Sequence, residues 1–198
     1  MNDKFFDLKK EKQDRMINAA LKIFGQYGYR FASTDDIVKE AAISKGLLFH
    51  YFGSKLGLYS FIYDYSVRYM CMELKAAIGN DETDFFTLYK QVESGKLQVL
   101  KNYPCMQLFL DKCAQETVSE ALMAIEEKRC ELQKVYDDID SKADLHIFPS
   151  LDVAEKVRQM LKYTIRCTME KQFHEHAFQP EMLYQENIAY INVLQSLL

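Results

Sequence analysis

The segment ISKGLLFHYFGSK, residues 43–55, places four ring-bearing side chains in succession between two glycines. The rings of residues 49–52 cannot all face one core, because successive residues of a helix are turned about 100° apart. If Leu48 and Phe52, four residues apart, point inward, the three rings between them face at least partly outward. The segment therefore predicts a short helix with one buried face and one exposed face that is rich in rings.

A second short helix is predicted just before this segment. Ser33, followed three residues later by Asp36, resembles a capping box and opens a helix over residues 35–41. The chain then turns at AAIS, and Ser44 caps the ring-rich helix over residues 45–52. Two short helices joined by a turn of about three or four residues are the geometry of a helix-turn-helix.

The outward face of the second helix is suited to a DNA groove. Gly46 lets the backbone approach closely, and the hydroxyl of Tyr51 and the imidazole of His50 can donate to phosphate oxygens. Lys45, at the helix start, reaches a guanine edge or a phosphate. The residues available for a groove are Lys45, Gly46, Leu47, Phe49, His50 and Tyr51.

The rest of the chain is predicted to be helical as well, which makes the fold class all-α. There are only three prolines and seven glycines, with no Asn-Gly or Asp-Gly turn and no sustained alternation of apolar and polar residues. Asp152, with Glu155 three residues on, resembles a further capping box, and Gly28 stands where the first helix ends. Spacing predicts further helices over residues 11–27, 55–78 with Ser54 as its cap, 84–100, 104–114, 117–138, 152–174 and 180–198.

The composition indicates a chain that folds on its own in a reducing compartment. Its 198 residues are 48% apolar, enough for a sizeable core. The five cysteines are odd in number and widely spaced, without a Cys-x-x-Cys pair, and no apolar leader or long uncharged apolar run occurs. We expect a cytoplasmic protein with no membrane span.

The net charge of −4 hides a division along the chain. Residues 1–60 carry ten Lys and Arg against seven Asp and Glu, a balance of +3, and residues 61–198 carry fifteen against twenty-two, a balance of −7. The basic excess gathers at Lys4, Lys9, Lys10, Lys12 and Arg15. Such a run is often a solvated helix face, but beside a recognition element it favours contact with nucleic acid.

The run INAALKIFGQYGYRFASTDDIVKEAAISKGLLFHYFGSKLGLY resembles the amino-terminal DNA-binding domain of the TetR family of transcriptional regulators. The resemblance implies a helix-turn-helix domain over residues 9–60, joined by a long helix to a helical effector-binding and dimerisation domain over residues 61–198. It implies that Lys45, Leu47, Phe49, His50 and Tyr51 face DNA and that Ser33, Thr34 and Lys55 contact phosphates. The implied partners are a double-stranded, palindromic DNA operator and a second copy of the chain.

Three residues depart from the family's pattern. Ala42 stands where a glycine is usual in the turn, so either the turn tolerates a side chain or Ala42 accepts backbone strain. Leu47 replaces a small or hydroxylated residue and leaves apolar contact, for which a thymine methyl is the natural partner. Phe49 replaces a tyrosine and loses its hydroxyl. These departures leave the operator sequence open.

The carboxy-terminal part carries two further hypotheses. Its last two helices have apolar faces that suit a dimer interface, with intramolecular core as the alternative. The proposed interface residues are Val157, Leu161, Ile165, Leu183, Ile188, Ile191 and Leu194. Aromatic and thioether side chains suit an effector pocket, although such residues at helical spacing are more often core. The candidate pocket residues are Tyr63, Phe86, Tyr89, Met106, Phe109, Tyr136 and Tyr163.

These observations favour a homodimeric repressor, without a cofactor, that a small apolar or aromatic ligand releases from its operator. The alternative is a helical protein-interaction module or a small-molecule binder that does not bind DNA. An enzyme is disfavoured, because Glu-x-x-His, Gly-x-Ser-x-Gly and the glycine-rich phosphate loops do not occur. His174, His176 and Cys167 could bind a metal, but a surface histidine pair is the more common meaning of this pattern.

Overall fold

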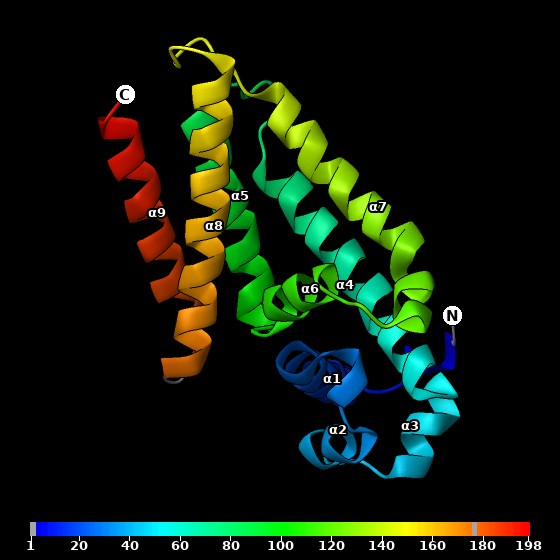
Figure 1. Cartoon of the computed structure of the whole chain (residues 1–198). Coiled ribbons are helices and arrows are strands. Elements are labelled where there is room, and N and C mark those ends of the chain that lie inside the picture. The colour runs from blue at the N-terminus through cyan, green and yellow to red at the C-terminus, as the bar shows by residue number, and fades with distance from the viewer. Residues whose placement is uncertain (1–2, 176–177) are drawn as a thin grey trace. The chain divides into compact units, whose positions relative to one another are not determined.

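The computed structural model describes residues 3–175 and 178–198, and every regular element in these ranges is a helix (Figure 1). The all-α prediction is confirmed. The elements are the short 3-10 helix η1 (Asp3–Phe5), then α1 (Lys10–Phe31), α2 (Thr34–Glu40), α3 (Lys45–Phe52), α4 (Lys55–Ala77), α5 (Phe85–Asn102), α6 (Met106–Ala114), α7 (Ser119–Lys142), α8 (Leu151–Glu175) and α9 (Pro180–Ser196). Within the described ranges, no helix has the length and apolar character that a membrane span requires.

The helices form two compact units. The first combines residues up to Tyr69 with residues 105–132, and the second combines residues 70–104 with residues 133–198. Helices α4 and α7 therefore contribute to both units. The predicted boundary after residue 60 falls inside α4, and the predicted division into domains 9–60 and 61–198 stays a prediction.

In the first unit, the amino-terminal helices are built around α1, whose apolar face is fully buried at Ile17, Leu21 and Phe24. Helix α1 packs on α6, and the backbones come close at Gly25, where an added β-carbon would lie 3.3 Å from the amide nitrogen of Phe109. Helix α1 has a kink at Gly28, where φ is 68° and ψ is 176°, so the chain leaves regular helical geometry at the predicted glycine, although α1 continues to Phe31.

The second unit has its core between α5, α8 and α9. One cluster joins Phe85, Phe86, Tyr89, Phe148, Ala154, Val157, Leu161 and Ile191, and a smaller one joins Leu100, Met169 and Leu183. A buried polar contact also connects α5 to α9, since the side-chain amide of Asn187 donates to the carboxylate of Glu93 at 2.8 Å. Asn187 is fully buried, so this bond fixes one pairing of α9 against α5.

Most of the residues predicted for a dimer interface are buried within the chain, which corrects the assignment of those residues. Their shared feature is burial within one chain, because α8 and α9 turn these faces toward α5 and toward each other. Val157, Leu161, Ile165, Leu183 and Ile191 are buried, and Ile188 and Leu194 pack against the same cluster while partly exposed. The five buried residues belong to the intramolecular core, the alternative that the sequence left open. For Ile188 and Leu194 a place in a dimer interface stays a prediction.

The helix starts follow the predicted caps in most cases. Asp84 accepts a hydrogen bond from the amide of Thr87 at 2.8 Å and caps α5, and Pro180 is the first residue of α9. The predicted capping box at Asp152 is wrong, because the hydroxyl of Ser150 accepts from the amide of Val153 and α8 already begins at Leu151. Serine and aspartate are both good caps, so the pattern alone did not separate them.

Candidate nucleic-acid interface

Ser33 caps α2 as predicted, but not through the predicted capping box, in which its hydroxyl would accept from the amide of Asp36. The hydroxyl of Ser33 accepts from the amide of Asp35 at 3.1 Å. Ile37 and Ala41 are buried under α2, with 1% and 0% of their surfaces exposed. Thr34 starts the helix and is half-buried, while Asp36 is exposed. The start of α2 thus carries Ser33 and Thr34 beside two acidic residues.

The turn between α2 and α3 places Ala42 in the left-handed region, with a φ of 51°. Two backbone bonds close the end of α2, from the amide of Ile43 to the carbonyl of Val38 at 3.0 Å and from the amide of Ala42 to the carbonyl of Lys39 at 3.2 Å. This is the Schellman pattern, which favours glycine at the left-handed position. Ala42 therefore accepts backbone strain, which decides between the two outcomes that the sequence allowed.

Helix α3 has one buried anchor and a solvent-facing side. The hydroxyl of Ser44 accepts from the amide of Leu47 at 3.2 Å, and Leu48 is 1% exposed. The predicted DNA-facing residues all remain accessible: Lys45, Gly46 and His50 are exposed, and Leu47, Phe49 and Tyr51 are half-buried. The structure brings these six residues onto a single helix, and their contact with DNA stays a prediction.

The junction of α3 and α4 depends on two glycines. Gly53 ends α3 with a φ of 71°, and the hydroxyl of Ser54 caps α4 by accepting from the amide of Gly57 at 3.0 Å. A β-carbon on Gly57 would overlap the carbonyl oxygen of Phe52. The first turn of α4 can therefore lie this close to the end of α3 only because residue 57 lacks a side chain.

Lys55 lies half-buried at the start of α4, facing the protein. Its ammonium group donates to the carbonyl of Arg30 at 3.3 Å and lies 4.7 Å from the ring centre of Tyr29. Burial lowers the pKa of Lys55, against the opposing effect of Glu120 and Glu116. The predicted phosphate contact of Lys55 stays a prediction, and it requires this side chain to turn outward.

Tyr29 connects the end of α1 to the start of α7. Its hydroxyl donates to the carboxylate of Glu120 at 2.8 Å, and its amide donates to Glu116 at 3.2 Å. Burial and the bond to Glu120 raise the pKa of Tyr29 to about 12. The phenol therefore stays protonated and keeps this bond throughout the neutral range.

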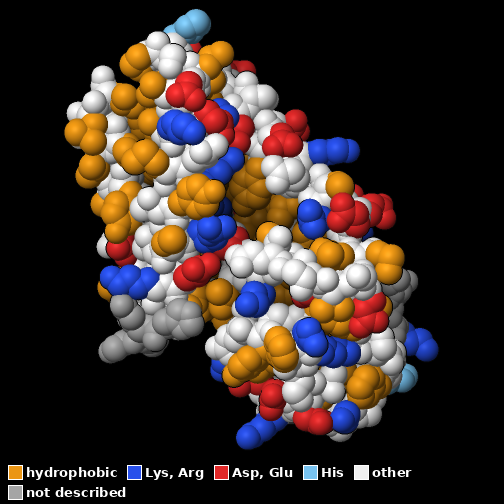
Figure 2. All heavy atoms as spheres, viewed as in Figure 1, with side chains coloured by type: hydrophobic (Ala, Val, Ile, Leu, Met, Phe, Trp, Pro, Cys, Tyr) orange, Lys and Arg blue, Asp and Glu red, His pale blue; other side chains and the backbone are white. Residues whose placement is uncertain are grey.

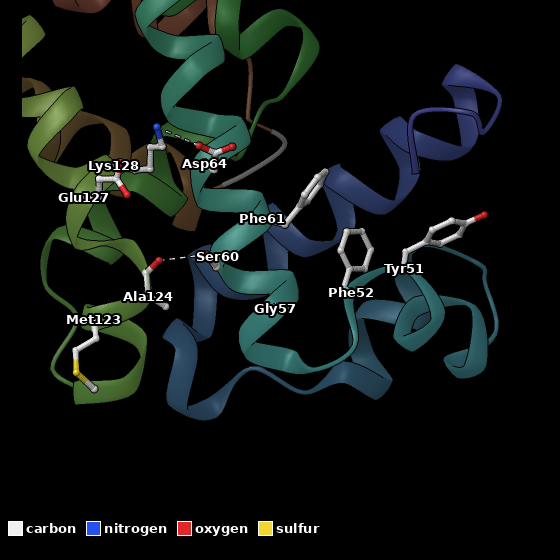
Figure 3. Close-up of a pocket in the computed structure, with 10 residues that line it drawn as sticks. All are labelled: Tyr51, Phe52, Gly57, Ser60, Phe61, Asp64, Met123, Ala124, Glu127 and Lys128. Atoms are coloured by element: carbon white, nitrogen blue, oxygen red, sulfur yellow. Dashed lines mark hydrogen bonds and ion pairs between the residues drawn. The ribbon is translucent and has the colours of Figure 1, made fainter. Parts of the chain in front are cut away.

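A groove of about 470 Å³ lies beside the end of α3. Figure 3 shows Gly57, Ser60 and Asp64 along α4, with α7 on one side and Phe52 and Tyr51 on the other. The hydroxyl of Ser60 donates to the carbonyl of Ala124 at 3.1 Å, and Lys128 lies 3.7 Å from Asp64. The sequence did not reveal this groove, because its two walls come from segments far apart in the chain.

The predicted pocket residues are divided between the two units. Tyr63, Met106 and Phe109 are buried in the first, where the rings of Tyr63 and Phe109 lie 6.2 Å apart. In the second unit Phe86 and Tyr89 are buried and Tyr136 is partly buried, whereas Tyr163 is 58% exposed on α8. The exposure of Tyr163 argues against its place in an enclosed pocket. His176 and the side chain of His174 lie outside the described part of the chain.

Comparison with known proteins identifies the amino-terminal segment. Residues 16–60 match the family described as bacterial regulatory proteins, tetR family. Over 59 residues the chain is 44% identical to the uncharacterized HTH-type transcriptional regulator YuxN of Bacillus subtilis (strain 168), covering 28% of this chain and 20% of that protein. It is 40% identical over 48 residues to the HTH-type transcriptional regulator HbdR of Aromatoleum sp. (strain CIB), covering 24% of this chain and 21% of that protein. The chain thus spans about a fifth of the length of these two relatives.

Solved structures match the fold over most of the chain. A TetR family transcriptional regulator from Chloroflexus aurantiacus J-10-FL has a TM-score of 0.60 at 21% identity, covering 98% of this chain and 89% of that one. The transcriptional regulator FadR from Bacillus subtilis has a TM-score of 0.56 at 17% identity, covering 89% of this chain and 96% of that one. These likenesses concern the fold.

The capped helices α2 and α3, the strained turn between them and the following helices define a helix-turn-helix protein with a carboxy-terminal helical part. Residues 16–60, the segment that matches the tetR family of bacterial regulatory proteins, contain both of these helices and the turn, and the fold over most of the chain is similar to that of solved TetR family regulators.

Proposed function

We propose that this chain is a sequence-specific DNA-binding transcriptional regulator. The observation that carries the proposal is α3, whose single buried anchor, Leu48, leaves the other side of the helix accessible. Lys45 and His50 on that side are exposed and can donate to base edges or phosphates. The basic balance of residues 1–60 supplies attraction to DNA that does not depend on sequence.

We further propose that the regulator acts as a homodimer on a palindromic operator. Proteins with a helix-turn-helix read two half-sites through a two-fold axis. Helices α8 and α9 support this part of the proposal, since apolar side chains gather on their outer surface (Figure 2). The large hydrophobic side chains of α8 and α9 that are more than a third exposed are Leu151, Met160, Tyr163, Met182, Tyr190 and Val193, and Leu197 and Leu198 directly after α9 are exposed as well. A solvated patch of this kind favours burial against a second copy.

The finer mechanism that we propose is repression relieved by a small apolar or aromatic ligand. FadR, which shares the fold, was solved in complex with stearoyl-CoA, so this helical plan can hold an apolar ligand. In the present chain the candidate residues with buried rings are Tyr63 and Phe109 in one unit and Phe86 and Tyr89 in the other. A ligand lowers operator affinity only to the extent that it binds the DNA-free state more tightly.

The test is selection of duplexes from a random DNA pool by the purified chain, followed by measurement of affinity against salt concentration. A regulator should enrich one palindromic sequence and bind it at least about 10³-fold more tightly than a scrambled duplex. Affinity for both duplexes should fall steeply with salt.

Enrichment of no sequence, together with weak binding of every duplex, would favour the alternative of an interaction module or a small-molecule binder. Ligand release is tested separately with compounds that raise the melting temperature, titrated with and without the selected duplex. Reciprocal weakening is required of a true effector.

A further inference from the structure

The segment before α1 forms a short arm whose two phenylalanines have opposite environments. Phe5, at the end of η1, is 0% exposed, whereas its neighbour Phe6 is 43% exposed. The side chains that bury the Phe5 ring come from other elements, α3 and α4.

The ring of Phe5 bridges the end of α3 and the first turns of α4. Its centre lies 5.3 Å from that of Phe52, 5.9 Å from that of Tyr51 and 5.1 Å from that of Phe61. The contacts with Tyr51 and Phe61 are edge-to-face, the favourable arrangement for aromatic pairs. In Figure 3, Phe61, Phe52 and Tyr51 follow one another on the same side of α4.

The arm is held in place by hydrogen bonds as well as by rings. The side-chain amide of Gln13, itself buried, donates to the carbonyl of Phe6 at 3.0 Å and to that of Leu8 at 2.7 Å. The amide of Leu8 donates in turn to the carbonyl of Phe5 at 3.3 Å. These bonds tie the arm to the first turn of α1 and fix where Phe5 can reach.

The carboxy-terminal end of α3 is packed against both the arm and α4. The helix spans eight residues, too few to be stable alone, and Leu48 in its middle is its one fully buried side chain. Phe52 at its end is only half-buried, with Phe5 and Phe61 on its ring. Phe5 of the arm therefore supplies one of the two rings that hold Phe52 at this end.

We propose that Phe5 is a positioning residue for DNA recognition. The arm of residues 3–8 packs against the end of α3 and fixes the orientation of the Tyr51 ring. This inference rests on the proposed DNA binding. His50 shares in the arrangement, because its ring lies edge-on to Tyr51 with centres 5.0 Å apart. The arm thus orients two side chains that face DNA without contacting DNA through Phe5.

The test compares Phe5→Ala, Phe5→Leu and Phe6→Ala on the duplex that the wild-type chain selects. Phe5→Ala should weaken binding by about tenfold, the loss expected if about one molecule in ten keeps α3 in the competent position. Phe5→Leu fills most of the space of the Phe5 ring and should restore most of the affinity. Phe6→Ala should bind within about twofold of wild type, because the Phe6 ring is largely solvated.

Two further measurements separate positioning from general destabilisation. Hydrogen exchange of Phe5→Ala should accelerate in α3 while α1 and α6 keep their protection. In a double-variant cycle, Phe5→Ala combined with Tyr51→Phe should lose less affinity than the product of the two single losses, whereas Phe5→Ala combined with Thr34→Ala should give the product.

Wild-type affinity in Phe5→Ala, or multiplicative losses with Tyr51→Phe, would overturn the positioning role and leave DNA binding intact. A wild-type chain that selects no duplex would instead overturn the proposed function. The hydrogen-exchange result would then still report whether Phe5 holds α3.

Discussion

The ammonium group of Lys45, the first residue of α3, lies 2.8 Å from the carboxylate of Asp35 in the first turn of α2. Both side chains are more than half exposed, and such surface pairs contribute about 0.2–1 kcal/mol. The pair is therefore weak enough to open. It nevertheless occupies the lysine that we propose to contact DNA, so binding requires Lys45 to leave Asp35.

The first prediction is that Asp35→Asn tightens operator binding. Without the carboxylate, Lys45 has no ion pair with residue 35 to break, and one negative charge near the DNA is removed. The gain should reach up to about fivefold, the equivalent of 1 kcal/mol for an exposed pair. Titration of a labelled operator at one fixed salt concentration measures it.

Asp36→Asn is the matched control for that experiment. Asp36 is also exposed and also lies in the first turn of α2, so its replacement removes the same charge without touching the ion pair. Asp35→Asn should increase the operator affinity more than Asp36→Asn does. Equal gains from the two variants would mean that general charge, and not the pair with Lys45, limits binding.

The second prediction concerns the strained turn, where Ala42→Gly should stabilise the protein. A left-handed conformation costs a residue with a β-carbon about 1–2 kcal/mol. Glycine removes this cost, but part of the gain is offset because glycine loses more conformational entropy on folding. A net gain of about 1 kcal/mol corresponds to a rise in melting temperature of about 2–4 °C. Thermal unfolding monitored by circular dichroism measures this rise.

The adjacent alanine provides the opposite case. Ala41 is fully buried with a φ of −74°, so Ala41→Gly removes a packed methyl group and gains nothing in backbone strain. Its melting temperature should fall. A fall in both variants would contradict the assignment of strain to residue 42.

Sequence reasoning succeeded where structure is decided locally. Ser44, Ser54 and Asp84 cap their helices because a side-chain oxygen and an amide two or three residues away suffice for the bond. Ala42 adopts a positive φ where the end of α2 requires it, and Gly28 does so at the kink in α1. The helix-turn-helix and its accessible residues follow from such local rules.

The sequence does not predict the packing of a helix face when the residues that cover this face are distant in the chain. Leu161 and Ile191 lie on apolar helix faces that fit a dimer interface and an internal core equally well, and only the packing of α5 against them decides for the core. The burial of Phe5 was missed for the same reason, since the rings that bury it lie on α3 and α4. The pair Phe5-Phe6 within a basic segment was the available signal.

The third prediction is that alanine substitutions at Gly46 and Gly57 change the stability of the protein in opposite directions. Gly57→Ala should destabilise the protein by about 1–3 kcal/mol, because the new methyl group meets the backbone oxygen of Phe52 and a backbone atom cannot move aside easily. Gly46→Ala should stabilise α3 by up to about 1 kcal/mol, because no heavy atom lies within 4 Å of the added carbon. Urea unfolding gives both values.

The same two variants should behave differently on DNA. Gly46→Ala keeps the fold but places a methyl group where we propose that the backbone of α3 approaches the operator, so its affinity should fall despite its higher stability. Undiminished affinity in Gly46→Ala would show that the backbone at residue 46 stays away from DNA. A Gly57→Ala variant as stable as wild type would refute the close contact between α3 and α4.

The last prediction is that Val193→Glu dissociates the proposed dimer without unfolding the chain. Val193 is 56% exposed on α9, lies three residues from the exposed Tyr190 on the same helix face, and lies four residues before Leu197, which is exposed just after the helix ends. A glutamate buried there against a second copy would lose its hydration without a partner, at a cost of several kcal/mol. Sedimentation should then report the 23.2 kDa monomer where the wild type sediments at twice that mass.

Two further variants serve as controls for Val193→Glu. Asn192→Glu adds the same charge at the adjacent exposed position, turned about 100° around the helix, and should leave the dimer in place. Leu161→Glu puts the charge into the internal core, where the residue is 0% exposed, and should lower helicity rather than only the mass. If Val193→Glu stayed dimeric while folded, the second copy would have to bind elsewhere than on this face of α9, because a contact that covers Val193 cannot accommodate an unpaired carboxylate at so little cost.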